Sequence, residues 1–238
     1  MNKQTTVRGV AAAAAVLGLA LAGCGSDTKP ESSSSAAEST SATSSEAAET
    51  STSAAESSTA AAPAGENYTV AEYIRDNGIT EAQVKRGDES APKVNLPAPA
   101  GWIDAGPGTP EWAYSQLVFT DPSMPPPPPT ITAIMSKLTG NVDSAKILEF
   151  APGELRNLPQ FDGPAEGQPD KLGGFDAVQV GGTYVKDGKN LLVAQKTTVI
   201  PADDGVYVLQ INAEGTEEQM GPLMDATSAI DDETTITP

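Results

Sequence analysis

The clearest hydrophobic pattern of this chain is an alternation in its C-terminal third. Over residues 206–213, Tyr207, Leu209 and Ile211 alternate with polar residues such as Gln210. A period of two is typical of a β-strand with one buried face and one solvated face. We therefore predict a strand here, with the tyrosine, leucine and isoleucine in the core.

Two further apolar segments, 177–185 and 190–200, precede this strand. They flank Asp187-Gly188, a pair that favours a tight hairpin turn because both residues tolerate positive φ. The turn residues 203–205 then lead into the third strand. The pattern predicts three consecutive antiparallel strands.

Upstream, the segments 112–120 and 131–138 are rich in β-branched and aromatic residues and also read as strands. Between them lies a run of five prolines, 125–129, which cannot join a central strand because proline has no backbone N–H. We predict a surface loop in polyproline II form at this point. An extended segment, 94–102, should end in a tight turn.

Helices are indicated at four places. Thr69 and Glu72 have the spacing of a capping box and open a short helix that Gly78 ends. We place a second short helix over 79–86, and a third over 144–150 that Pro152 should stop or kink.

The last predicted helix covers 217–230. Its apolar side chains fall on one stripe at helical spacing: Met220, Leu223, Met224, Thr227 and Ile230. An antiparallel sheet with helices laid on it is the natural packing of these elements, so the predicted fold class is α+β.

The segment before this domain has a different composition. Residues 31–60 contain only Ser, Thr, Ala and Glu, which gives the segment almost nothing to bury. We interpret residues 24–65 as a disordered tether with an r.m.s. span of about 35 Å, and residues 66–238 as one α+β domain.

The N-terminus has the three parts of a secretory signal. Lys3 and Arg8 precede an apolar run over 10–20, and Leu-Ala-Gly-Cys follows at 21–24. That tetrapeptide matches a bacterial lipobox, in which Cys24 receives a diacylglycerol after residues 1–23 are removed. The apolar run is shorter than the about 20 residues of a spanning helix. The sequence therefore predicts a lipid anchor on the extracytoplasmic side of the cell membrane.

The chain is strongly acidic, with 14 Lys and Arg, 32 Asp and Glu, and no histidine. Removal of Lys3 and Arg8 with the signal peptide shifts the net charge from −18 to −20. Such a charge argues against nucleic acid as a partner. The absence of histidine removes the commonest general base and transition-metal ligand, so we predict no enzymatic activity, no metal site and no cofactor.

The sequence has two tight acidic clusters, 203–204 and 231–233. We interpret 203–204 as turn residues and 231–233 as a solvated helix end.

Aromatic residues make up only 5% of the chain, which makes Trp102, Trp112 and Tyr114 conspicuous. Each could belong to the core, and some could instead line the mouth of an apolar pocket and stack on a sugar ring or an acyl chain. Met124, beside the proline run, offers an adaptable apolar contact. These four residues are the candidate ligand-binding set.

An ordered series of short motifs resembles one known family. The motifs are Leu96-Pro97-x-Pro99-x-Gly101-Trp102, Gly174-Phe175-x-Ala177, Gly181-Gly182-Thr183-Tyr184 and Tyr207-x-Leu209-x-Ile211. They resemble the LpqN/LpqT family of mycobacterial cell-envelope lipoproteins over essentially all of 66–238. The resemblance implies a Mog1/PsbP-like α/β/α sandwich without enzymatic activity. It also implies a link with trehalose-mycolate lipids, MmpL-type lipid transporters and mycolyltransferases.

Two functions from different classes follow. The first is an anchored module that binds or presents an envelope lipid and assists lipid transport. The second is a protein-interaction adaptor that docks to envelope transporters without a small-molecule ligand. A hydrolase with an unrecognised site is a third, weaker reading.

We predict that Cys24→Ala or Cys24→Ser blocks lipidation and processing, because the chain has no other thiol. Membrane fractionation should find the variant released or unprocessed, and globomycin should accumulate the precursor of the unaltered protein. Normal membrane retention of the variants would contradict the anchoring hypothesis.

Overall fold

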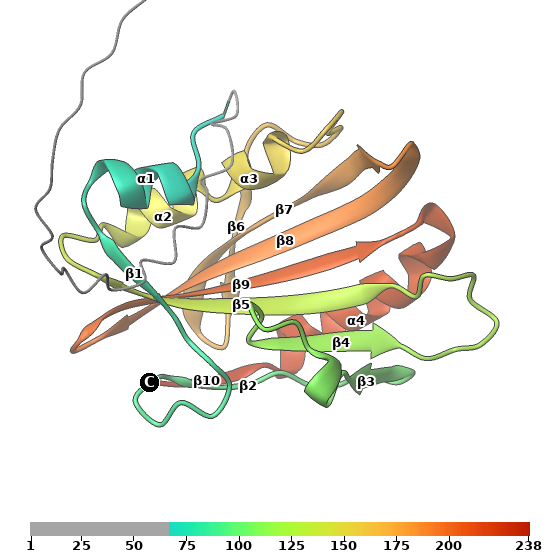
Figure 1. Cartoon of the computed structure of the whole chain (residues 1–238), viewed down its shortest axis with the longest axis horizontal. Helices are drawn as coiled ribbons and strands as arrows, with labels where there is room; N and C mark the ends of the chain where they lie inside the picture. Colours follow the sequence, from blue (N-terminus) through green and yellow to red (C-terminus); the bar gives the residue numbers. More distant parts are fainter. Residues whose placement is uncertain (1–66) are drawn as a thin grey trace, which may run out of the picture. The chain divides into compact units, whose positions relative to one another are not determined.

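The computed structural model describes residues 67–238, and its main feature is one large antiparallel sheet (Figure 1). The strands are β1 Thr80–Gln83, β2 Lys93–Asn95, β3 Trp102–Asp104, β4 Ser115–Phe119, β5 Thr130–Thr139, β6 Gln168–Leu172, β7 Phe175–Lys186, β8 Lys189–Ala202, β9 Gly205–Gly215 and β10 Thr235–Thr237. The helices are α1 Val70–Asp76, α2 Ser144–Phe150, α3 Pro152–Arg156 and α4 Met220–Glu233, with short 3₁₀ turns at Gly106–Gly108 and Glu217–Gln219. The predicted signal peptide, Cys24 and the tether lie outside the described residues.

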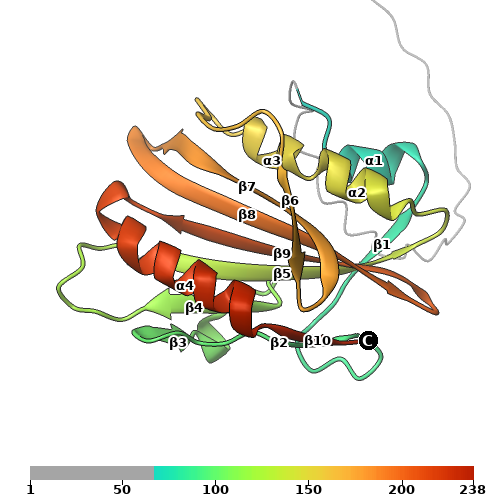
Figure 2. The same cartoon turned by 180° about the vertical axis from the view of Figure 1, so that it is seen from behind.

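The eight-stranded sheet has the order β3-β4-β5-β9-β8-β7-β6, with β1 paired to β5, while β2 and β10 pair separately. Helices α1, α2 and α3 cover one face, and Figure 2 shows α4 lying across the other. The arrangement is the predicted α+β fold, with helices on both sides of an antiparallel sheet.

The predicted three-strand meander is confirmed as β7, β8 and β9. Asp187 and Gly188, in the β7–β8 turn, have φ values of 52° and 73°, as a tight hairpin turn of this kind requires. In β9 the side chains of Tyr207, Leu209 and Ile211 are 1%, 0% and 4% exposed. The period-two pattern therefore identified the core face correctly.

Helix α4 packs on that core face through Leu223, Ala226 and Ile230. The predicted stripe was wrong for Met220 and Met224, whose side chains are 40% and 63% exposed. Spacings of three and four residues between the buried side chains put the two methionines on the flank of the helix. The flank of α4 that carries these two methionines is therefore apolar and faces solvent.

The opposite face of the sheet was expected to be wet, and this is wrong for Gln210 and Asn212. Both are half-buried, and the side chain of Gln210 donates to Glu154 of α3, so they lie on the face that carries α1, α2 and α3. Leu138, Val178 and Val199 form a second core cluster there. The sheet is covered on both faces, so alternation in β9 separates an apolar layer from a polar hydrogen-bonded layer.

The helix caps are confirmed where the sequence carries them. The Thr69 and Glu72 side chains form the reciprocal capping box of α1, and Asp143 accepts hydrogen bonds from the first turn of α2. Pro152 sits at the first position of α3, directly after α2, so it starts a new helix.

The predicted helix over 79–86 is wrong, because residues Thr80–Gln83 form β1. Gly78 has a φ of 61° and redirects the chain, after which β1 pairs antiparallel with β5. The buried Ile79 and Val84 anchor the two ends of the strand. Pairing with β5, which is distant in the sequence, outweighs the local preference for a helix in this segment.

The predicted turn before β3 is confirmed. Trp102 N donates to Pro99 O at 2.9 Å, and Gly101 has a φ of 83°. A Cβ atom at Gly101 would lie 2.6 Å from the ring of Phe119, so glycine is required there for space as well as for conformation.

The proline run forms the β4–β5 loop, as predicted, and is attached to the start of α4. The buried Gln219 donates to Pro125 O at 3.0 Å and to Pro127 O at 2.9 Å. These carbonyls are the hydrogen-bonding groups that a proline backbone retains.

We predict that Leu209→Ala lowers the free energy of unfolding by about 3–5 kcal/mol, because it opens a cavity at a fully buried position. Met224→Ala, on the exposed flank of α4, should change it by no more than about 0.5 kcal/mol. Urea unfolding of the two variants measures the difference. Equal losses would show that α4 packs through a different face.

Candidate functional site

A row of small residues crosses the sheet beneath α4. Gly181 of β7 lies directly opposite Ala194 of β8, which lies opposite Ala213 of β9. The side chains of directly opposed residues project from the same face of a sheet. These three residues therefore form a floor that carries no side chain larger than a methyl group. Space is left between this floor and the helix.

That space consists of two cavities of about 330 Å³ and about 300 Å³. Both are lined by the floor residues and by Thr227 of α4, so they form one continuous groove, which we call the α4 groove. One part is bordered by Leu192, Met220 and Met224 and is almost entirely apolar. Ala194 is exposed, so the groove opens to solvent above the floor.

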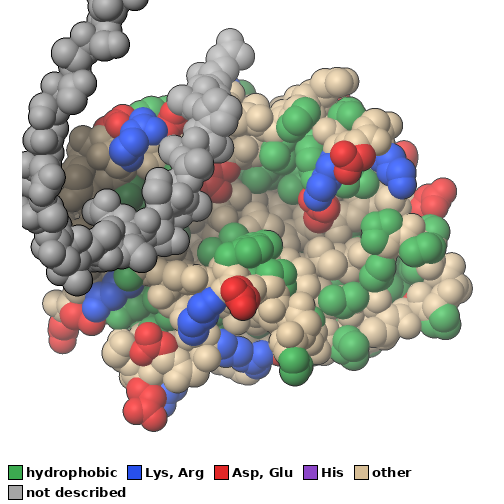
Figure 3. Space-filling view, in the orientation of Figure 1, with side chains coloured by type: hydrophobic (Ala, Val, Ile, Leu, Met, Phe, Trp, Pro, Cys, Tyr) green, Lys and Arg blue, Asp and Glu red, His purple; other side chains and the backbone are tan. Residues whose placement is uncertain are grey.

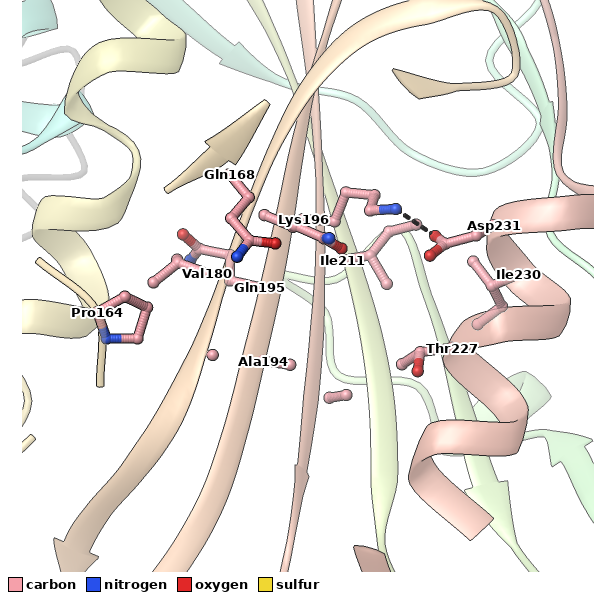
Figure 4. A pocket seen from close by; sticks show the side chains of 13 residues that line it. Pro164, Gln168, Val180, Ala194, Gln195, Lys196, Ile211, Thr227, Ile230 and Asp231 are labelled. Atoms are coloured by element: carbon pink, nitrogen blue, oxygen red, sulfur yellow. Dashed lines mark hydrogen bonds and ion pairs between the residues drawn. The ribbon is translucent and has the colours of Figure 1, made fainter. Parts of the chain in front are cut away.

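The other end of the α4 groove carries an ion-pair cluster, of which Figure 4 draws the pair of Lys196 and Asp231. Lys196 Nζ lies 2.6 Å from Asp170 Oδ2 of β6 and 2.5 Å from Asp231 Oδ1 of α4, and its side chain is only 8% exposed. Hydrogen bonding to the ammonium group lowers the pKa of Asp170. The prediction that 231–233 is merely a solvated helix end is therefore wrong for Asp231.

The four predicted ligand residues are not brought together. Trp102 is 5% exposed and packs on Phe119 with ring centres 5.4 Å apart. It also borders a separate cavity of about 440 Å³ on the other side of α4. Tyr114 is buried, whereas Trp112 is 57% exposed in the turn before β4.

Met124 is half-buried in the β4–β5 loop. None of the four predicted residues lines the α4 groove. The residues that do line it, such as Gly181, Ala194 and Lys196, carry no local motif. The turns at 187–188 and 203–204 set the register that brings 181, 194 and 213 together, but no pattern in the sequence places α4 above them.

A second row, this one polar, crosses the opposite face. Gln116, Thr132, Asn212 and Gln195 lie opposite one another on β4, β5, β9 and β8. Gln116 Nε2 donates to Thr132 Oγ1 at 3.0 Å, and Gln195 Nε2 donates to Asn212 Oδ1 at 3.1 Å. Figure 3 shows this side of the molecule, where uncharged polar groups and backbone lie around a hydrophobic patch near the middle of the face.

Glu154 of α3 closes the polar row. Its Oε2 accepts from Gln195 Nε2 at 3.1 Å and also from Gln210 Nε2. Burial raises the pKa of Glu154 because the charged carboxylate loses hydration there. Gln195 Oε1 is buried without a hydrogen-bond partner, which leaves one acceptor of the row unsatisfied.

Comparison with known proteins identifies the family. The family model described as "Probable lipoprotein LpqN" matches residues 66–237. This chain belongs to the LpqN family. A member of the LpqN family, lipoprotein LpqN of Mycobacterium tuberculosis (strain ATCC 25618 / H37Rv), is 53% identical over 228 residues, which cover 96% of this chain and 97% of that protein.

A solved structure supports the same assignment. It is described as LpqN involved in cell envelope biogenesis of Mycobacterium tuberculosis, and it aligns with 51% identity and a TM-score of 0.68. The alignment covers 73% of this chain and 100% of the solved one, so the solved chain is about as long as the domain of residues 66–238. The Ran-binding protein Mog1p of Saccharomyces cerevisiae aligns over 65% of this chain with 16% identity and a TM-score of 0.38.

Two further observations concern residues 67–238. No helix in this part is long and apolar enough to cross a membrane. No group of three or more His, Cys, Asp or Glu side chains in this part is arranged to hold a metal ion.

We predict that Glu154→Gln stabilises the domain at pH 7. The raised pKa means that the ionised carboxylate is disfavoured in the folded state, a cost that exists above the unfolded pKa of about 4.3 and vanishes as both states become protonated. The new amide can also donate to Gln195 Oε1. Urea unfolding at pH 7 and pH 4 should show a gain that shrinks on acidification.

Glu149→Gln is the control, because Glu149 lies in an exposed ion pair with Lys146. It should have little effect at either pH. A Glu154→Gln variant that is equally destabilised at both pH values would show that the carboxylate is needed as an acceptor.

Proposed function

We propose that this protein is a membrane-anchored lipoprotein of the cell envelope that binds or presents an envelope lipid of the trehalose-mycolate type. In this proposal an acyl chain of the lipid lies in the α4 groove. The protein then assists lipid transport in envelope biogenesis, as a binding protein and not as an enzyme. The observation that carries the proposal is the apolar groove above the small-residue floor.

The α4 groove leaves apolar surface in contact with water. Met220, Met224 and Ala194 are all exposed along it. Burying apolar surface contributes about 25 cal/mol per Å², or about 0.8 kcal/mol for each CH₂ group. An acyl chain on the floor would therefore be held mainly by the hydrophobic effect.

The acidic composition supports an apolar mode of binding. A net charge of −18, or −20 after signal cleavage, gives no attraction for anionic headgroups or an anionic membrane surface. Salt screens contacts between charges but leaves apolar burial nearly unchanged. Lipid affinity should therefore depend little on ionic strength.

The cell-envelope context of the proposal has two supports. The solved relative is described as involved in cell envelope biogenesis. The sequence also carries the lipobox that ends in Cys24.

An adaptor role is the second candidate. Ile103 of β3 and Trp112 are 53% and 57% exposed, which is unusual for such large apolar side chains. Both belong to the β3–β4 side of the domain. A transporter of the MmpL type or a mycolyltransferase could dock there without any lipid in the α4 groove.

We predict that Ala194→Phe blocks lipid binding, because its ring would fill the groove above the floor. The segment 66–238 should bind a fluorescent acyl-trehalose, and the variant should lose at least about tenfold in affinity. Ala82→Phe is the matched control, since Ala82 is an exposed alanine of β1 outside the groove. Fluorescence titration at low and high salt measures both quantities.

Equal binding by Ala194→Phe and Ala82→Phe would place the ligand elsewhere. Absence of saturable binding, together with intact binding to a transporter's soluble domain, would favour the adaptor role. Trp112→Ala should then weaken that protein interaction.

A further inference from the structure

The α4 groove combines an apolar channel with one charged side chain. Lys196 points from β8 toward α4 and lines the groove, as Figure 4 shows. Lysine is almost never buried unless it is paired, and here both partners are carboxylates, Asp170 and Asp231. A ligand without polar atoms would make no hydrogen bond or ion pair with this cluster.

The ammonium group has hydrogen-bonding capacity to spare. It carries three N–H donors, and two carboxylate oxygens, one from Asp170 and one from Asp231, accept from it. The third donor of Lys196 is therefore available to an oxygen atom that enters the groove. An acyl chain lying over Ala194 would bring its polar end to this point, because Ala194 and Lys196 are two residues apart on the same face of β8.

The net charge of Lys196, Asp170 and Asp231 together determines which kind of ligand oxygen can bind at this end of the α4 groove. One ammonium and two carboxylates give the Lys196 end a net charge of −1 in a partly desolvated position. A free carboxylate or a phosphate would meet Asp170 and Asp231 at close range, and such a juxtaposition of like charges disfavours binding of the anion. A neutral oxygen accepts the hydrogen bond without that repulsion.

We propose that the Lys196 end of the α4 groove recognises a neutral oxygen next to the acyl chain, such as an ester carbonyl or a hydroxyl, and rejects a free acid. This inference rests on the proposed function and narrows its ligand to uncharged acyl derivatives. Lys196 is the donor to the ligand, and Asp231 is the group that excludes anions. Asp170 holds the ammonium in place from β6.

The test compares two probes that differ only in this charge, cis-parinaric acid and its methyl ester, at pH 8. The segment 66–238 should bind the ester at least about tenfold more tightly than the acid. Asp231→Asn removes one negative charge from the cluster and should largely abolish this preference by improving binding of the acid. Fluorescence titration gives each affinity.

The neighbouring residue supplies a matched control. Asp232 is exposed on the same helix, so Asp232→Asn changes the net charge of the protein equally but should leave the preference for the ester intact. Circular dichroism and thermal unfolding establish that both variants are folded. If Asp231→Asn unfolds, the comparison of acid and ester on the unaltered domain still decides the proposal.

Equal affinity of the unaltered domain for the acid and the ester would overturn this inference while leaving the proposed function intact. The same conclusion would follow if Asp231→Asn and Asp232→Asn altered the preference to the same extent. Failure of both probes to bind, with Ala194→Phe also without effect, would instead contradict the proposed function itself.

Discussion

The functional architecture of this domain depends on the antiparallel register of β7, β8 and β9. That register places Gly181, Ala194 and Ala213 opposite one another on the face that α4 covers. The large side chains of Leu223 and Ile230 keep α4 at a distance from the sheet. The floor residues beside them are glycine and alanine, whose side chains are too small to fill that distance. A close-packed interior would leave no such space. The α4 groove is thus the direct consequence of a pairing pattern combined with a helix stripe, and a slip of one residue in β8 would turn Ala194 to the opposite face and bring the larger Val193 or Gln195 into the floor.

The sequence predicted the features that depend on neighbouring residues. The Asp187-Gly188 turn, the capping box at Thr69 and the alternation in β9 are all local patterns, and all three are confirmed. The strand β1 was missed because its conformation is imposed by pairing with β5, 53 to 59 residues away in the chain. The α4 groove was missed for a different reason: the predicted turns fix which residues of β7, β8 and β9 lie side by side, but no local pattern shows where α4 crosses them. The aromatic residues selected as candidates are mostly core or loop residues instead.

The two faces of the sheet differ in chemistry along the small-residue row and the polar row although they share the same strands. On the α4 face, small and apolar residues leave an open groove with an ion-pair cluster at one end. On the other face, next to the second core cluster, amide and hydroxyl groups bond to one another and to Glu154 of α3. Such a polar network fixes side chains and so favours a single register, because any slip would leave buried amides unpaired. The hydrogen bonds of the polar row thus stabilise the strand register that also forms the floor of the α4 groove.

The attachment of the β4–β5 loop to α4 has a mechanical consequence. Gln219, at the start of α4, holds the carbonyl groups of Pro125 and Pro127, and the loop is stiff because proline fixes its φ angles. Met220 and Met224, which border the groove, belong to the first turns of the same helix. A displacement of those turns has either to move the stiff proline loop with them or to break two partly buried hydrogen bonds. The position of the β4–β5 loop and the width of the α4 groove are therefore coupled through the first turns of α4.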